Sequence, residues 1–230
     1  MFLNSSYIIF MVPAFLLMML AQWYVKSAYS RWEKVQNQAG LTGAQIAQKL
    51  IERVGLYDVE IEAAQGRLGD HYDPRNKVLR LSPGVGQGSS VASAAIAAHE
   101  LGHAEQDNQD YLPLRLRSAI VPVVNIGSNL GWILIMAGFF LQLTGLAWLG
   151  VAFFAGGAIF ALATLPVELD ASRRARAMLT TAGIITSDEE QRGVNQVLNA
   201  AAMTYVAGLV TAVLQLLYYA SLVTGMGRRR

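Results

Sequence analysis

Long apolar runs constrain this chain more than any other feature of its sequence. The first, residues 7–25, contains no charged side chain and is about long enough to cross a hydrocarbon core of roughly 30 Å. Of the 230 residues, 53% are hydrophobic and 15% are charged, and the mean hydropathy is +0.35. These values are unlike those of an ordinary soluble protein, so the sequence predicts a mainly α-helical integral membrane protein.

Further apolar runs follow later in the chain. Residues 120–141 and 146–165 are separated by only a few residues, so we expect a tight transmembrane hairpin over 118–165 that returns the chain to the side it left. The last run lies in an expected helix over 194–224, which either spans the membrane or lies at its interface. The sequence thus predicts three to four transmembrane helices in a lipid bilayer.

Basic residues flank the apolar runs. Lys26, Arg31 and Lys34 follow the first run at once, which places its C-terminal end in the cytoplasm under the positive-inside tendency. We therefore expect a cell-membrane protein whose polar region and active site face the cytoplasm. A cleaved signal peptide is the alternative reading of residues 7–25, but no basic segment precedes this run and no clear small-residue cleavage site follows it.

The rest of the composition narrows the chemistry. A formal net charge of +2 is too small to argue for nucleic acid as a partner. The chain has no cysteine, so disulfides, thiolate catalysis and cysteine-ligated zinc are excluded. Histidine, aspartate and glutamate remain as the side chains expected to bind a metal ion.

The main polar region, residues 26–117, is expected to form a small α+β domain. Thr42 followed by Gln45 resembles a capping box at the start of a helix. Alternating apolar and charged residues predict a strand over 59–63, and a Pro-containing turn separates it from a second expected strand over 77–82.

A long alanine-rich helix is expected after a glycine-rich connector over 82–88. Ser89 or Ser90 can cap this helix, which should run to about Gln109. It carries two of the chain's three histidines in the order His-Glu-Leu-Gly-His, which is an HExxH motif at positions 99–103.

The HExxH motif points to a metal ion. A helix brings residues i and i+4 onto one face, so His99 and His103 can bind one ion while Glu100 can reach a water at the metal. The chemistry implied is zinc-assisted hydrolysis by zinc-activated water, in which Glu100 acts as general base during attack on a peptide carbonyl.

A catalytic zinc usually has three protein ligands, so a third donor must lie elsewhere in the chain. Glu105 and Asp107 share the motif helix, but Glu105 is only two residues past His103 and Asp107 lies one turn further along. Glu168 is better placed, because it begins a polar helical segment over 166–193 where the hairpin returns to the membrane surface. A solvated charge at a helix start is the alternative reading of Glu168.

Three stretches in combination resemble a known family. AAHELGHAEQ, then PVELDASRRA after the hairpin, together with GRLGDHYDPRNKVLRLS, are similar to the YugP-type membrane zinc metallopeptidases, also called neutral zinc metallopeptidases. The similarity covers nearly the whole chain. It implies a small zincin-like metalloprotease domain in which His99, His103 and Glu168 bind one Zn²⁺ and Glu100 is the base.

A more distant resemblance is to the HtpX-type membrane proteases. In that family the glutamate ligand starts a Glu-x-x-x-Asp pattern, whereas here the fourth position after Glu168 is Ser172. We therefore expect either Asp170 or Ser172 itself to orient a histidine ligand.

Other side chains are candidates for binding substrate. An additional donor should stabilise the tetrahedral oxyanion, and the candidates are His71, Tyr72 and Arg173. The alternatives are a turn-stabilising role for His71 and a membrane-flanking role for Arg173. The second expected strand could be an exposed edge that pairs with an extended substrate; its residues are Val78, Leu79, Arg80 and Leu81.

Two functional classes follow from these patterns. The first is a membrane-embedded zinc endopeptidase that acts on membrane proteins or peptides. The second is a noncatalytic zinc-binding membrane assembly or scaffold protein, which would have no need of the base Glu100. A zinc-dependent deacylase or other amide hydrolase is a further alternative among enzymes. The sequence leaves open whether the protein forms an oligomer or binds a partner protein.

Overall fold

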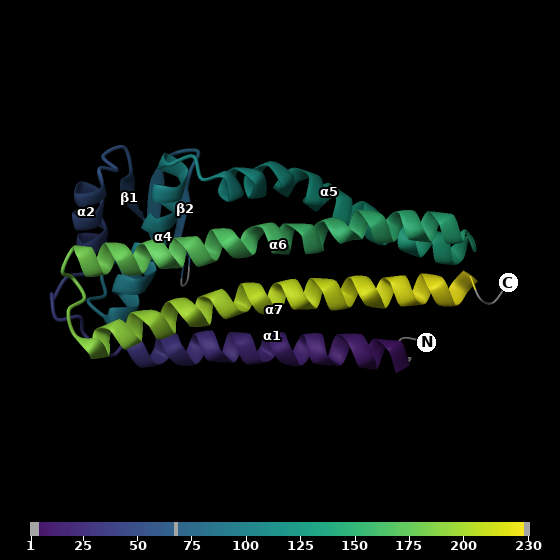
Figure 1. Ribbon diagram of the computed structural model, residues 1–230, viewed down its shortest axis with the longest axis horizontal. Helices are drawn as coiled ribbons and strands as arrows, with labels where there is room; N and C mark the ends of the chain where they lie inside the picture. Colours follow the sequence, from purple (N-terminus) through teal and green to yellow (C-terminus); the bar gives the residue numbers. More distant parts are fainter. Residues whose placement is uncertain (1–4, 67–68, 228–230) are drawn as a thin grey trace. The chain divides into compact units, whose positions relative to one another are not determined.

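The computed structural model describes residues 5–66 and 69–227 (Figure 1). Seven helices and three strands follow one another in these residues: α1 (Ser5–Trp32), α2 (Gly43–Val54), β1 (Glu60–Ala63), β2 (His71–Asp73), β3 (Val78–Leu81), α3 (Pro83–Gly86), α4 (Val91–Asn108), α5 (Leu112–Phe140), α6 (Thr144–Thr181) and α7 (Asp188–Gly227). The chain divides into two compact units. In the described residues, the first unit comprises 5–22, 115–165 and 204–227, and the second comprises 23–66, 69–114 and 166–203.

The first unit is built from segments of the four long helices α1, α5, α6 and α7. Each of these helices is long and apolar enough to cross a membrane, with hydropathy between 1.7 and 2.1 over its most apolar window. Only 11–17% of the residues in those windows are buried within the protein. Their exposed apolar side chains suit a lipid environment. The protein is therefore a mainly α-helical membrane protein with a small α+β domain, as the sequence predicted.

Small residues allow α5 and α6 to approach closely within the first unit. A Cβ added to Gly131 would lie 2.8 Å from the carbonyl oxygen of Gly150, and one added to Gly138 would lie 2.7 Å from the Cβ of Ala147. Close backbone approach at small residues is a common way for membrane helices to associate. The predicted hairpin therefore packs through its glycines.

Local capping signals define the ends of helices in the second unit. Thr42 Oγ1 accepts a hydrogen bond from the backbone of Gln45, and the Gln45 side chain accepts one from the backbone of Thr42. Gly55 ends α2 in the left-handed region with φ 76°, where glycine avoids the strain of a side chain. The buried side of α2 then packs on α4, and the capping box predicted at Thr42 is confirmed.

The strand order of the sheet is β1-β3-β2. The outer strand β1 pairs with β3 in parallel, and β2 pairs with β3 in antiparallel orientation. The expectation that Val78, Leu79, Arg80 and Leu81 form an exposed edge strand is therefore wrong. β3 is the central strand, because a third strand that the sequence did not predict, His71–Asp73, pairs with Val78, Leu79 and Arg80 on the side opposite β1.

The helix α4 lies at the centre of the second unit. Its N-cap is Ser90, whose side chain accepts a hydrogen bond from the backbone N–H of Ser93. The connector before it contains the short helix α3, which the sequence did not predict. Most α4 residues are buried, including the alanines at 92, 94, 95, 97 and 98, because small side chains let the surrounding elements approach closely.

Helix α6 continues without interruption through Pro166. The hairpin was expected to end before this residue and a separate segment to follow, but Thr144–Thr181 is one helix in the structure. Its last part, from Pro166 onward, belongs to the second unit. Glu168 and the motif helix α4 are therefore parts of the same compact unit.

Candidate metal centre

His99 and His103 lie one turn apart on α4, as the helical spacing requires. Their ring centroids are 4.9 Å apart and the ring planes meet at 81°. Each side chain is 12% exposed, so both imidazoles are largely shielded but remain reachable. The buried, alanine-rich course of α4 fixes the backbone from which both rings project.

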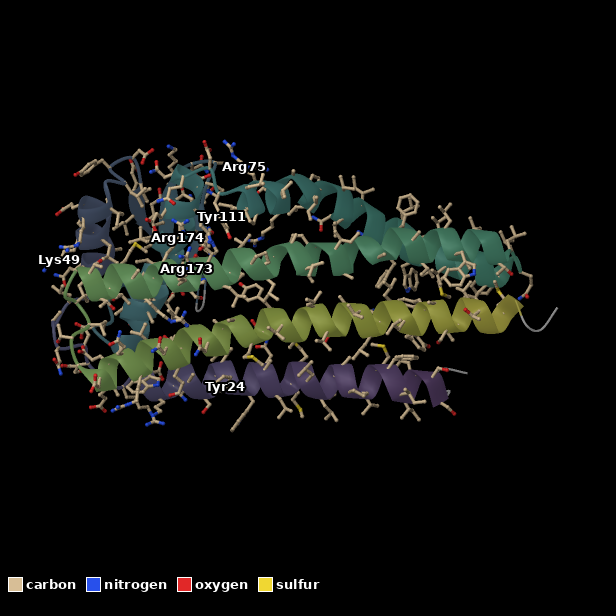
Figure 2. All side chains as sticks on the ribbon, in the orientation of Figure 1. Tyr24, Lys49, Arg75, Tyr111, Arg173 and Arg174 are labelled. Atoms are coloured by element: carbon tan, nitrogen blue, oxygen red, sulfur yellow. The ribbon has the colours of Figure 1, made fainter. Side chains whose placement is uncertain are left out.

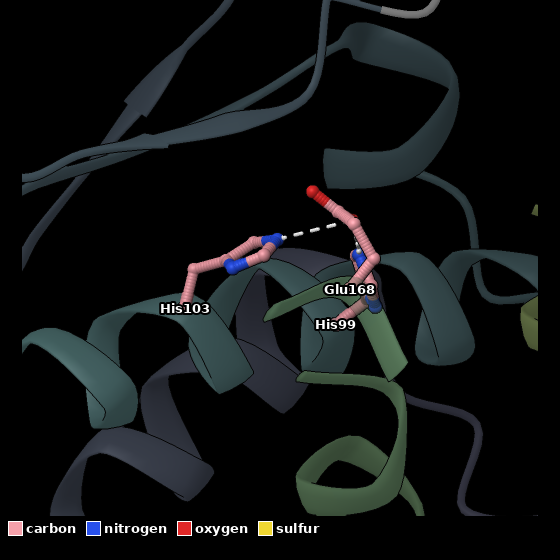
Figure 3. Close-up of side chains that lie close together, drawn as sticks. All are labelled: His99, His103 and Glu168. Atoms are coloured by element: carbon pink, nitrogen blue, oxygen red, sulfur yellow. Dashed lines mark hydrogen bonds and ion pairs between the residues drawn. The ribbon is translucent and has the colours of Figure 1, made fainter. Parts of the chain in front are cut away.

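Glu168 approaches both imidazoles from α6 (Figure 3). Its Oε2 lies 3.3 Å from Nε2 of His99 and 3.6 Å from Nε2 of His103. The residue is 2% exposed, and a buried carboxylate needs such partners to offset the cost of losing water. The structure thus brings together the three residues that the sequence indicated as ligands, with all their donor atoms within 4.8 Å of one another.

The donor set fits a zinc ion. Two imidazole nitrogens and one carboxylate oxygen are typical ligands of a catalytic zinc, which keeps its fourth position open. Bonds of about 2.0–2.2 Å in a tetrahedral arrangement separate neighbouring ligand atoms by roughly 3.3–3.6 Å. The distances from Glu168 Oε2 to the two histidines, 3.3 and 3.6 Å, agree with this spacing.

A second layer of hydrogen bonds holds the two imidazoles. Nδ1 of His99 lies 3.3 Å from Oγ of Ser172, and Nδ1 of His103 lies 3.1 Å from Oε1 of Gln106. Asp170 contacts Gln106 instead of either histidine ring, with Nε2 of Gln106 donating to Oδ2 across 3.0 Å. Of the two residues expected to orient a histidine, Ser172 contacts His99 directly, whereas Asp170 reaches His103 only through Gln106.

Gln106 was missing from the candidates that the sequence suggested. An amide is not a common zinc ligand, but a residue three positions after His103 lies on the same face of the helix and can contact its imidazole. Its complete burial, with 0% exposure, is a property of the tertiary structure. The spacing His103-x-x-Gln106 was the one local signal that could have identified it.

Besides Gln106, two arginines contact the carboxylate of Asp170. Arg173 and Arg174 both donate hydrogen bonds to its carboxylate. The Arg174 guanidinium also pairs with Glu105 at 3.2 Å and lies over the ring of Tyr111, 5.7 Å from its centroid (Figure 2). Glu105, an alternative metal ligand on sequence grounds, is therefore engaged by an arginine.

Glu100 is held by the edge strand β2. The main-chain N–H of Tyr72 donates to Oε2 of Glu100 across 3.2 Å. Burial raises the pKa of the Glu100 carboxyl above its ordinary value, although the nearby histidines oppose this shift. For His103, burial alone would lower the pKa, but the hydrogen bond with Glu168 holds the pKa above its ordinary value.

The candidate oxyanion donors occupy three different surroundings. His71 is exposed, and its Nδ1 lies 2.7 Å from the carbonyl oxygen of Gly69. The Tyr72 hydroxyl donates to Asp107 at 3.0 Å, so its main-chain N–H is the part of this residue that contacts the site. The side chain of Arg173 is 74% exposed and binds Asp170.

Taken together, the fold and the site define a class: membrane proteins that carry an HExxH helix, with a glutamate from a distant helix beside its two histidines, in a small α+β unit. A family model described as "Putative neutral zinc metallopeptidase" matches residues 7–224, and the chain belongs to this family. The chain is also 43% identical over 199 residues to the "Putative membrane protease YugP" of Bacillus subtilis (strain 168). That match covers 86% of this chain and 88% of the relative. No solved structure matches. The family resemblance predicted from the motifs is confirmed.

Proposed function

We propose that this protein is a membrane-embedded zinc endopeptidase that hydrolyses peptide bonds in membrane proteins or peptides. One observation carries the proposal: the donor atoms of His99, His103 and Glu168 lie within 4.8 Å of one another, and Glu168 lies 3.3 and 3.6 Å from the two imidazoles. Glu100 directly follows His99 on α4. Its carboxylate can therefore act as the base that takes a proton from the attacking water. A purely structural zinc site has no use for such a base.

Each residue has a separate role in this proposal. His99, His103 and Glu168 hold one Zn²⁺, which when bound lowers the pKa of a water molecule toward about 7 and polarises the substrate carbonyl. Glu100 accepts the proton of the attacking water and passes it to the leaving amine. Its raised pKa suits a residue that must both take up and release a proton.

The substrate strand is proposed to lie along β2 instead of β3. Because β3 is the central strand, its backbone has no free side for a peptide. The strand β2 is an edge, and the N–H of Tyr72 points from it toward Glu100. An extended peptide that adds to this edge would bring its backbone beside the base, a recurrent mode of peptide recognition.

The site is proposed to face the cytoplasm from the cell membrane. Lys26 and Arg31 lie in the C-terminal part of α1 and Lys34 follows its end, and positive charges of this kind favour the cytoplasmic side. A reporter fused after Lys34 in the full chain would give a cytoplasmic signal. An external signal would overturn this orientation and leave the peptidase proposal intact.

Zinc analysis combined with proteolysis of a membrane-protein panel tests the activity. The wild type is expected to contain one zinc per chain and to cleave, whereas Glu100→Gln keeps the zinc and loses cleavage. Glu52→Gln on α2 is a matched control, because this carboxylate is exposed and hydrogen bonds to Gln48. Stoichiometric zinc with no difference in cleavage between wild type and Glu100→Gln would favour the noncatalytic scaffold function. If the wild type cleaved acyl amides but no peptide bonds, a deacylase would be favoured.

A further inference from the structure

The side chain of Gln106 hydrogen bonds both to α4, which carries the two histidines of the metal centre, and to α6, which carries Glu168. Its Oε1 lies 3.1 Å from Nδ1 of His103 on α4. Its Nε2 donates to the carbonyl oxygen of Val167 at 2.8 Å and to Asp170 at 3.0 Å on α6. Val167 directly precedes Glu168, so the amide reaches the backbone that carries the third ligand.

The partners of Gln106 fix which way its amide points. A backbone carbonyl and a carboxylate can only accept hydrogen bonds, so the NH₂ group must face Val167 and Asp170. The amide oxygen then faces His103, and Nδ1 of this imidazole must be the donor. In this arrangement Nε2, which faces Glu168, is the nitrogen left to bind a metal ion.

We propose that Gln106 is a positioning residue that joins the two halves of the metal centre, fixing the ring of His103 and the segment of α6 that presents Glu168. The inference rests on the metal site of the proposed function and is independent of whether the protein cleaves peptides. A neutral amide performs this task without adding a negative charge beside Asp170, whose carboxylate is already held by Arg173 and Arg174.

Close packing of the same two helices supports this role. A Cβ added to Gly102 would lie 2.5 Å from the carbonyl oxygen of Ala171, so α4 and α6 are in backbone contact beside the amide. Gln106 is 0% exposed, so its hydrogen bonds to His103, Val167 and Asp170 are shielded from bulk water. The position of Glu168 relative to His103 therefore depends on this side chain.

Zinc affinity of the full-length protein in detergent, measured against a competing chelator, tests the proposal. Gln106→Met removes every hydrogen bond of the amide, while Gln106→Glu keeps the shape and an acceptor for His103 but loses the donors to α6. Both variants are expected to bind Zn²⁺ roughly 10–100-fold more weakly than the wild type. Gln109→Met is the matched control, because Gln109 is an exposed glutamine at the C-cap of α4 that bonds to Glu105 and Arg174 and contacts neither histidine.

The visible absorption of Co²⁺-substituted protein distinguishes positioning from general packing. At saturating Co²⁺, the Gln106 variants should give a spectrum different from that of the wild type, and Gln109→Met should give the wild-type spectrum. If Gln106→Met fails to fold, the isosteric Gln106→Glu decides the outcome. Wild-type affinity and spectrum in Gln106→Glu would overturn the proposal while leaving the zinc site in place, whereas a wild type that binds no zinc would overturn both.

Discussion

The main-chain N–H of Tyr72 donates a hydrogen bond to Oε2 of Glu100 across 3.2 Å, and this contact ties an edge strand of the sheet to the proposed base. The side chain of the same residue donates to Asp107 further along α4. Two groups of one residue thus hold β2 against the motif helix. Their contributions can be separated by substitution.

Replacing Tyr72 with proline removes the N–H that reaches Glu100. This N–H points away from β3, and proline is tolerated at such positions of an edge strand. We expect Tyr72→Pro to cut kcat/KM about tenfold or more relative to Tyr72→Ala, since a hydrogen bond to a charged group contributes roughly 1.5–3 kcal/mol. Both variants lose the hydroxyl, so equal peptidase activity in the two would show that the N–H has no part in the reaction.

Zinc should stabilise the fold through its ligands. A free zinc concentration a hundredfold above Kd is expected to raise the free energy of unfolding by about 2.7 kcal/mol. Glu168→Gln should lose most of this gain at the same zinc concentration, because one of the three donors is weakened. Thermal unfolding with and without zinc measures the effect, and an equal zinc-induced shift in Tm for both proteins would exclude Glu168 as a ligand.

A side chain at position 102 should force α4 and α6 apart. The Cβ of Gly102→Ala would meet backbone atoms of Ala171 at 2.5–3.1 Å, and backbone cannot move aside as a flexible side chain can. We expect a loss of about 1–3 kcal/mol in the free energy of unfolding, together with weaker zinc binding. Gly208→Ala is the control, because its added Cβ has nothing within 4 Å; similar losses in both variants would contradict the close-contact explanation.

Acid should weaken the turn between β2 and β3. Hydrogen bonds from Asn76 and Arg80 hold the pKa of Asp73 below its ordinary value of 3.8. A pKa lowered by folding means that this stabilisation is complete well above pH 3.8 and is lost as the pH falls below that value.

Asp73→Asn should therefore be less stable than the wild type at pH 7 and should lose less stability on acidification. Thermal unfolding between about pH 2 and 7 measures the difference. Glu60→Gln, at an exposed position of β1, serves as the control. An acid dependence in Asp73→Asn as steep as that of the wild type would show that this carboxylate contributes nothing to it.

Local signals in the sequence predicted the helices well. The capping box at Thr42, the serine cap before the motif helix and the apolar runs each act over a few residues, so their consequences can be read without the rest of the chain. The pairing of His99 and His103 follows from helical spacing alone. The prediction that Glu168 lies beside these histidines depended on one further inference, namely that the hairpin returns the chain to the same side of the membrane.

Long-range pairing was harder to predict. The strand His71–Asp73 is too short to display an alternating pattern, and its position beside β3 depends on contacts that form only in the folded domain. For that reason the sequence could not indicate that Val78–Leu81 would be central in the sheet. Gln106 was missed on similar grounds, because its partners Val167 and Asp170 come from a helix that is distant in sequence.

The division of the three-donor cluster between α4 and α6 also sets an order of events during synthesis. Glu168 follows His99 by 69 residues, so at about 5–20 residues per second a ribosome needs roughly 3–14 seconds to add it after the first histidine. For nearly all of that interval the nascent chain carries His99 and His103 without Glu168. The cluster is therefore completed only after the membrane hairpin has been synthesised. A chain that ends before α6 would carry the HExxH motif but would lack Glu168.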